Sequence, residues 1–148
     1  MRVTGVGNRL IGLAAALLLA ASAAPALAQG KRIALVIGNA AYPDAPLKNP
    51  ANDARAMADS LKSRGFEVIL RENAGRIAMN DAVADFGEKL TEGSTALFFF
   101  AGHGIQVQGR NYLIPTDAKI GSEQRVRLET LDVEAVLDQM SAARASRW

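Results

Sequence analysis

The stretch STALFFFAGHGIQVQGRNYLIPTDA, residues 94–118, decides the fold expected for this chain of 148 residues. Apolar residues 96–101 run without interruption into Gly102, His103 and Gly104. A short apolar run that ends in glycine is typical of a strand buried on both faces of a parallel sheet. His103 is the only histidine, and the chain contains no cysteine. The sequence therefore raises the question of why a single imidazole follows directly on a buried strand.

Upstream of this strand, apolar runs at 32–38 and 66–71 predict two more strands. Between the runs, apolar residues recur at helical spacing and predict one helix from Pro50 to about Gly65 and a second that carries Met79 to Leu90 and is closed by Gly93. Residues 105–114 alternate around Gly109 and predict a hairpin, residues 115–125 are polar and predict a loop, and a third helix is expected over Asp132–Ala143. Strands that alternate with helices predict an α/β fold, a doubly wound, mostly parallel sheet with a small β-hairpin after the third strand.

In such a sheet of order 2-1-3, the first and third strands are neighbours and their connections leave in opposite directions. Ligands bind at this switch point, beyond the carboxyl ends of the strands. We therefore expect the loop 39–49 and the segment 102–104 to open at the same edge.

The N-terminal 28 residues have the layout of a secretory signal peptide. Arg2 and Arg9 precede an apolar run at 10–21, and the small-residue pattern Ala26-Leu27-Ala28 follows. We expect cleavage near Gln29 and export to the periplasm or the medium, with an uncleaved membrane anchor as the alternative. The mature part, 29–148, is expected to form one domain.

The charge of the mature part excludes several classes of function. Removing residues 1–28 removes two arginines and no acid, so fifteen basic residues face fifteen acidic ones. We find no basic cluster that indicates nucleic-acid binding. The lack of cysteine excludes disulfides and thiolate metal sites, and we expect no cofactor and no metal.

Physical chemistry alone leaves the role of His103 open. A histidine at a strand end can simply bond to the backbone. It can also act as a general acid or base, because imidazole titrates near neutral pH. Flanking glycines allow a ligand to approach closely.

The segments KRIALVIGNAAYPDAPLKNPANDARAMADSLKSRGFEV and ALFFFAGHGIQVQGRNYLIPTDA resemble the large-subunit domain of caspase-like cysteine peptidases, in particular those of bacterial metacaspase type. The resemblance covers about Lys31 to Ala143. It implies that His103 is the histidine of a Cys-His dyad and that the N–H of Gly104 contributes to an oxyanion hole. It also implies that Asp53 lines the pocket that selects Arg or Lys in a peptide or protein substrate. The position of Asp53 also has a purely structural explanation, because the helix dipole favours an acid in the first turn of a helix.

The family carries its nucleophilic cysteine at the end of a fourth strand, after the helix that ends near Ala143, and this chain has none. Neither Ser94, Ser141, Ser146 nor Thr116 offers a replacement, and Thr116 and Asp117 are expected to be turn residues. Without a fourth strand, the apolar strand 95–101 would have an exposed edge. A stable binding module is expected to cover or charge such an edge, and the sequence shows no such change. We therefore expect a catalytic domain that is truncated at its C-terminus. The chain alone would then be inactive.

Two alternatives stay open. One is a non-catalytic caspase-fold module that binds peptides or a partner in the periplasm. The other is an unrelated doubly wound domain of flavodoxin or receiver type, although the loop after the first strand lacks a phosphate-binding run. The natural substrate, calcium dependence and oligomeric state cannot be predicted from these residues.

Overall fold

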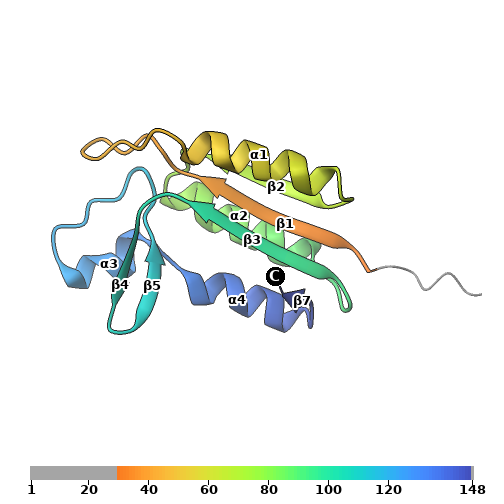
Figure 1. The fold of residues 1–148 in the computed structure, drawn as a ribbon. Coiled ribbons are helices and arrows are strands. Elements are labelled where there is room, and N and C mark those ends of the chain that lie inside the picture. Colours follow the sequence, from red (N-terminus) through yellow and green to blue (C-terminus); the bar gives the residue numbers. More distant parts are fainter. Residues whose placement is uncertain (1–29, 148) are drawn as a thin grey trace, which may run out of the picture.

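The computed structural model describes residues 30–147 (Figure 1). Its main sheet has four parallel strands in the order β2-β1-β3-β7, and these span Glu67–Glu72, Arg32–Gly38, Thr95–Ala101 and Ser146–Arg147. A smaller antiparallel sheet has the order β4-β5-β6, with strands Gly104–Val107, Arg110–Leu113 and Leu131–Asp132. The predicted α/β fold with its central 2-1-3 order and hairpin is confirmed. The predicted signal peptide, 1–28, lies outside the described residues.

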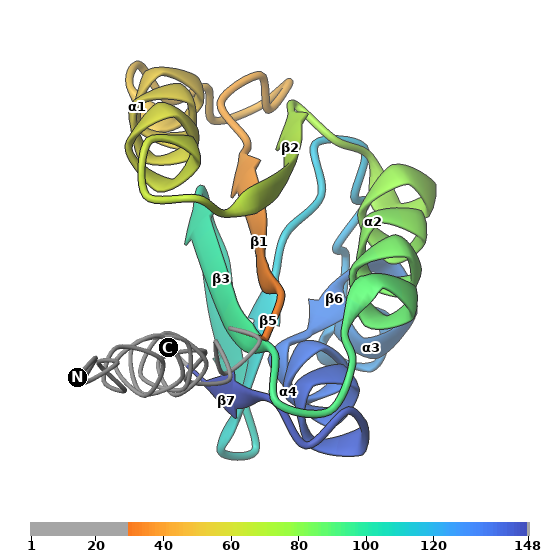
Figure 2. The ribbon, with the colours of Figure 1, turned by 90° about the vertical axis from the view of Figure 1, so that its right-hand side faces the viewer.

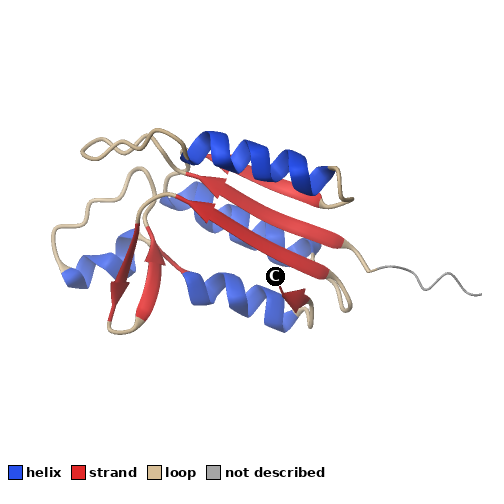
Figure 3. Ribbon diagram, viewed as in Figure 1, coloured by secondary structure: helices blue, strands red, loops and turns tan. Residues whose placement is uncertain are grey.

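Helices cover both faces of the main sheet, as the alternation of strands and helices predicts. The helices are α1 (Pro50–Lys62), α2 (Arg76–Lys89), α3 (Glu123–Glu129) and α4 (Val133–Ala142), of which α3 packs through Val126 against the hairpin and not against the main sheet. Helix α1 packs on one face of the sheet, and α2 and α4 pack together on the other (Figures 2 and 3). The described part of the chain contains no helix that is long and apolar enough to cross a membrane.

The strand β1 supplies side chains to both layers of the core. Ile33, Leu35 and Ile37 point to the α2 and α4 side, while Ala34 and Val36 point to α1. This alternation follows from the two-residue period of a strand. Burial on both faces explains why β1 is a continuous apolar run.

Helix α1 lies unusually close to the end of β1. A Cβ atom on Gly38 would be 2.4 Å from the carbonyl oxygen of Pro50 and 2.6 Å from the Cβ of Ala54. Only glycine permits this approach. As a result, the loop 39–49 leaves β1 and enters α1 at the carboxyl edge of the sheet. Pro50 opens the helix as predicted, whereas Asn49 makes no side-chain capping bond.

Two elements differ from the sequence prediction. The segment expected to be a loop, 115–125, ends inside α3, a helix whose one buried residue is Val126 and which therefore lacks an apolar stripe. Residues 146–147, expected to precede any fourth strand, form β7 and pair in parallel with Thr95 and Ala96 of β3. This strand arises from backbone pairing and has no apolar run that would reveal it.

Asn39 joins three segments at the carboxyl edge of the sheet. Its side chain is fully buried. The side-chain amide donates to the carbonyl oxygens of Ala74 and Ile114, and the side-chain oxygen accepts from the N–H of Ala74 at 2.8 Å. The backbone N–H of Asn39 donates to the carbonyl oxygen of Ala101 at 2.8 Å. One residue therefore links the ends of β1 and β3 to the start of α2 and the end of the hairpin.

Replacing Asn39 by alanine should lower the free energy of unfolding by about 2–4 kcal/mol, because it leaves the buried N–H of Ala74 without its acceptor and removes the amide donor to the carbonyl oxygens of Ala74 and Ile114. Urea unfolding of both proteins, followed by circular dichroism, measures the change. Asn52→Ala is the matched control, since Asn52 is an exposed residue whose side chain meets only the exposed Arg55. Equal stability of the two variants would contradict the linking role of Asn39.

Candidate active site

His103 follows β3 directly and lies at the carboxyl edge of the main sheet. Gly102 precedes it, and a Cβ atom there would be 2.6 Å from the hydroxyl oxygen of Tyr42 and 2.8 Å from the ring of Phe100. A larger residue would therefore displace Tyr42 or the strand. The glycine that the sequence places before the histidine is needed for close packing around it.

The imidazole of His103 is partly buried and is held by the loop 39–49. Its Nε2 lies 2.8 Å from the carbonyl oxygen of Ala45. Because a carbonyl oxygen only accepts hydrogen bonds, Nε2 carries the proton in this contact. The neutral ring then has Nδ1 as its basic nitrogen. The expectation that loop 39–49 and segment 102–104 open at one edge is confirmed by this contact.

Tyr42 contacts both the backbone and the ring of His103. Its hydroxyl accepts a hydrogen bond from the N–H of His103 at 3.0 Å and donates to the carbonyl oxygen of Ile114 at 2.9 Å. The two ring centroids are 4.5 Å apart with an interplanar angle of 54°. Burial raises the pKa of the Tyr42 phenol, although the hydrogen bonds to His103 and Asn39 act in the opposite direction. The neutral hydroxyl is therefore the form that suits this site.

His103 opens on a cavity of about 390 Å³. The walls come from the loop after β1, the start of β4 and the segment after β5, and include Pro43, Asp44, Ile105 and Ile120. Asp44 is the one charged side chain among the described residues that line it. The cavity thus combines an imidazole, a carboxylate and several apolar side chains, a composition typical of a ligand site.

The structure brings two of the three predicted site residues together. Gly104 begins β4 and lines the same cavity as His103. Asp53 is exposed in the first turn of α1. This turn lies at the same end of the sheet (Figure 1), but Asp53 is not among the described residues that line the cavity.

Thr116 and Asp117 hold a turn, as the sequence predicts. The Thr116 hydroxyl donates to the carbonyl oxygen of Asn73, and the Asp117 carboxylate accepts from the N–H of Arg76 at 2.8 Å. This carboxylate caps α2 from a distant part of the chain, in the place that an N-cap side chain usually fills. Thr116 lines the same cavity as His103, but its hydroxyl is bonded to Asn73 and not to the imidazole.

Sequence reasoning missed Asn39, Tyr42 and Ala45. An asparagine directly after a buried strand and an aromatic residue in a polar loop were visible signals for the first two. Ala45 contributes only its carbonyl oxygen, so no side-chain pattern could have indicated it. No group of three or more His, Asp or Glu side chains that could hold a metal ion occurs in residues 30–147.

Comparison with known proteins agrees with this arrangement. The family model of the Caspase domain matches residues 31–144. The chain is 33% identical over 88 residues to the human (Homo sapiens) protein "Mucosa-associated lymphoid tissue lymphoma translocation protein 1", and equally identical to its homolog from mouse (Mus musculus). The matched part is 59% of this chain but only 11% of either relative.

The tautomer of His103 can be measured without assignment, because the chain has one histidine. In a ¹⁵N-labelled protein, at a pH where the ring is neutral, we expect the Nε2 resonance to be of the protonated type and the Nδ1 resonance of the basic type. The hydrogen bond to the Ala45 carbonyl causes this preference. A ring protonated at Nδ1 would contradict the site geometry.

Tyr42→Phe should lower the free energy of unfolding by about 1–3 kcal/mol, because the N–H of His103 loses its partner. The loss should also depend on pH. The folded state holds the phenol proton above the usual pKa of 10.0, so its contribution is complete below pH 10 and disappears as the pH rises through the raised pKa. Unfolding in urea at pH 8 and above pH 10 measures both effects. A difference between the two proteins that stays constant with pH would contradict the burial of this hydroxyl.

Proposed function

Since this chain belongs to the Caspase domain family, we propose that its mature part, 29–148, is part of a cysteine-type endopeptidase domain, of metacaspase type, that acts on peptide or protein substrates. The observation that carries the proposal is the way in which the His103 ring is held. The imidazole is anchored through Nε2, opens on a cavity and keeps Nδ1 as its basic nitrogen. A histidine of a Cys-His dyad needs this combination of fixed orientation and available base.

In the proposed reaction, Nδ1 of His103 takes the proton of a cysteine thiol. The thiolate attacks the carbonyl carbon of the scissile bond, and the imidazolium then gives its proton to the leaving amine. The N–H of Gly104 stabilises the oxygen anion of the tetrahedral intermediate. Gly104 is exposed beside His103 on the same cavity, which supports this role.

The cysteine itself is not among the 148 residues. We propose that it is supplied by a segment that pairs along the second edge of β3. Among the described residues, that edge is paired only at Thr95 and Ala96, through β7. Arg147 lies opposite Ala96, so a strand that kept this register would have its fifth following residue opposite Ala101, one step before Gly102 and His103. A thiol delivered there would approach the imidazole.

The proposed specificity is for Arg or Lys before the scissile bond, with Asp53 as the acidic residue of the pocket. The exposed position of Asp53 in the first turn of α1, at the carboxyl edge of the sheet, supports this assignment. We further propose export to the periplasm or the medium, which rests on the composition of residues 1–28.

The complete lack of cysteine favours one alternative. In it, the chain is a non-catalytic caspase-fold module that binds peptides or a partner through the His103 cavity. Both functions use the His103 cavity for binding and differ in whether a nucleophile is supplied.

Fluorescence anisotropy with a dye-labelled acetyl-Ala-Val-Arg amide tests the proposed substrate class. We expect binding to the full chain, and Asp53→Asn should weaken it about tenfold, because an ion pair with the arginine is lost. Asp59→Asn is the matched control, since Asp59 is an exposed carboxylate on the same helix.

No variant of this chain should release a reporter amine from Ala-Val-Arg substrates. Turnover that persists in His103→Ala would contradict the dyad assignment, and equal binding by the Asp53 and Asp59 variants would contradict the specificity. Sequencing the gene beyond codon 148 separates the two functions. An apolar strand ending in Asp-Ala-Cys is expected for the peptidase.

A further inference from the structure

The cavity at His103 continues into a groove along the hairpin. A hollow of about 520 Å³ lies between β4 and the segment that leads into α3, and it shares Ile105 and Ile120 with the cavity. A third hollow of about 420 Å³ follows at the hairpin turn and shares Val107, Gln108 and Glu123 with the second. We call the path through these three hollows the hairpin groove.

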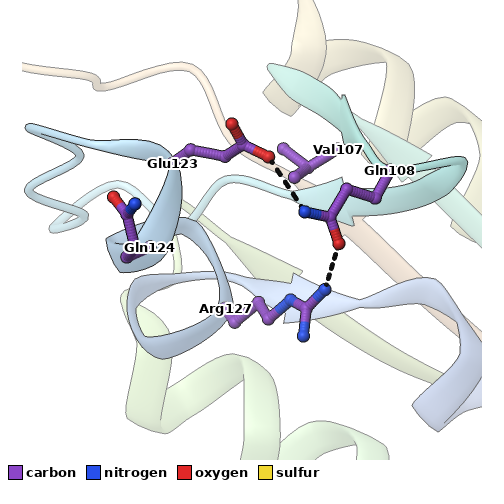
Figure 4. A pocket seen from close by; sticks show the side chains of 5 residues that line it. All are labelled: Val107, Gln108, Glu123, Gln124 and Arg127. Atoms are coloured by element: carbon purple, nitrogen blue, oxygen red, sulfur yellow. Dashed lines mark hydrogen bonds between the residues drawn. The ribbon is translucent and has the colours of Figure 1, made fainter.

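The far end of the hairpin groove is mostly polar. The Gln108 side chain donates to Glu123 at 3.4 Å and accepts from Arg127 at 2.8 Å, so the hairpin turn is joined to α3 (Figure 4). The near end combines the imidazole of His103 and the carboxylate of Asp44 with apolar side chains, among them Ile105 at 36% exposure. The groove thus leads from the imidazole over apolar side chains to a polar end.

One wall of the hairpin groove is an open strand edge. Among the described strands, β4 pairs only with β5. The N–H of Ile114 donates to the carbonyl oxygen of His103, and hydrogen-bonded pairs alternate in antiparallel strands. In the register of the hairpin, Ile105 and Val107 therefore bond toward β5. Gly104 and Gln106 direct their backbone groups to the open edge.

The chemistry at His103 decides which part of a substrate meets this edge. The imidazolium protonates the amine that leaves, so the residues after the scissile bond start beside His103. From there β4 runs away from the site. A peptide added parallel to β4 would bond to the backbone groups of Gly104 and Gln106. These groups are two residues apart, which is also the spacing of the backbone groups on one edge of an extended peptide. Every second side chain would lie on the face of Ile105 and Ile120.

We propose that the hairpin groove binds the substrate segment that follows the scissile bond, as an extended strand added to β4, with apolar side chains on Ile105 and Ile120. This inference rests on the proposed peptidase function and deepens it. Strand addition derives affinity from main-chain hydrogen bonds and selectivity from alternate side chains. The occupant argued for is an extended polypeptide, because the groove is continuous with the His103 cavity.

The test uses the full chain and a probe that mimics the leaving-group product, Ala-Val-Thr-Val-Thr-Gly, with a free N-terminus and a C-terminal dye. We expect saturable anisotropy binding that weakens at least about tenfold when both valines become serine or when Ile105 becomes aspartate. Ile77→Asp is the matched control, since Ile77 is an isoleucine at 67% exposure on α2. The ring signals of His103 should shift on binding.

A second pair of variants tests the open edge. Gln106→Pro removes the outward N–H and should abolish probe binding, whereas Gln106→Ala keeps that N–H and should bind within about threefold of the original chain. Circular dichroism checks that both fold. If Ile105→Asp and Ile77→Asp bind the probe equally, or if His103 signals do not move, the inference is overturned.

Two further outcomes separate this inference from the proposed function. If acetyl-Ala-Val-Arg amide binds in an Asp53-dependent way but the product probe does not, the groove inference fails alone. If the product probe binds as expected while the arginine probe does not, the proposed specificity fails and the groove stands. Self-association that Gln106→Pro removes and the probe cannot displace would assign the edge to a second copy and overturn the inference.

Discussion

The whole arrangement depends on the hydrogen bonds of one buried side chain, that of Asn39. Parallel pairing of β1 with β3 brings the carboxyl ends of both strands to the same edge of the sheet. The pairing alone does not fix the loops that leave from these strand ends. Asn39 does so, because its fully buried amide group satisfies backbone groups of Ala74 and Ile114. Unpaired polar groups at such a position are costly. The loop 39–49, the start of α2 and the end of the hairpin are therefore locked together.

This lock explains how a loop can orient a catalytic-type imidazole. A carbonyl group on a mobile loop would hold a histidine poorly. Here Ala45 belongs to a loop whose base is fixed by Asn39 and whose aromatic residue, Tyr42, is wedged between His103 and Ile114. The hydroxyl of Tyr42 bridges the N–H of His103 and the carbonyl oxygen of Ile114, while the N–H of Ile114 donates directly to the carbonyl oxygen of His103. Tyr42 thereby joins the base of the hairpin to the loop that holds the His103 ring.

The elements that bury apolar side chains could be predicted from the sequence, and those that rest on polar contacts could not. The run that ends at Ala101 and the stripe of α2, with Phe86 fully buried, carry strong periodic patterns. Helix α3 carries one buried residue and is held by Gln108, and β7 is defined by backbone pairing. The same division applies to the site. His103 is conspicuous because it is unique, whereas its partner Ala45 acts through a carbonyl group that every residue possesses.

The proposed chemistry divides the site into two sides. On one side of His103, the edge of β3 beyond Ala96 offers backbone groups to a strand that could carry a thiol. On the other side, the edge of β4 and the apolar residues Ile105 and Ile120 lead away from the ring. Anchoring through Nε2 keeps the imidazole between them, since the ring cannot rotate without losing the Ala45 contact. A base that receives a proton from one edge and releases it toward the other needs little movement, and this fixed position suits proton transfer from a nucleophile to a leaving group.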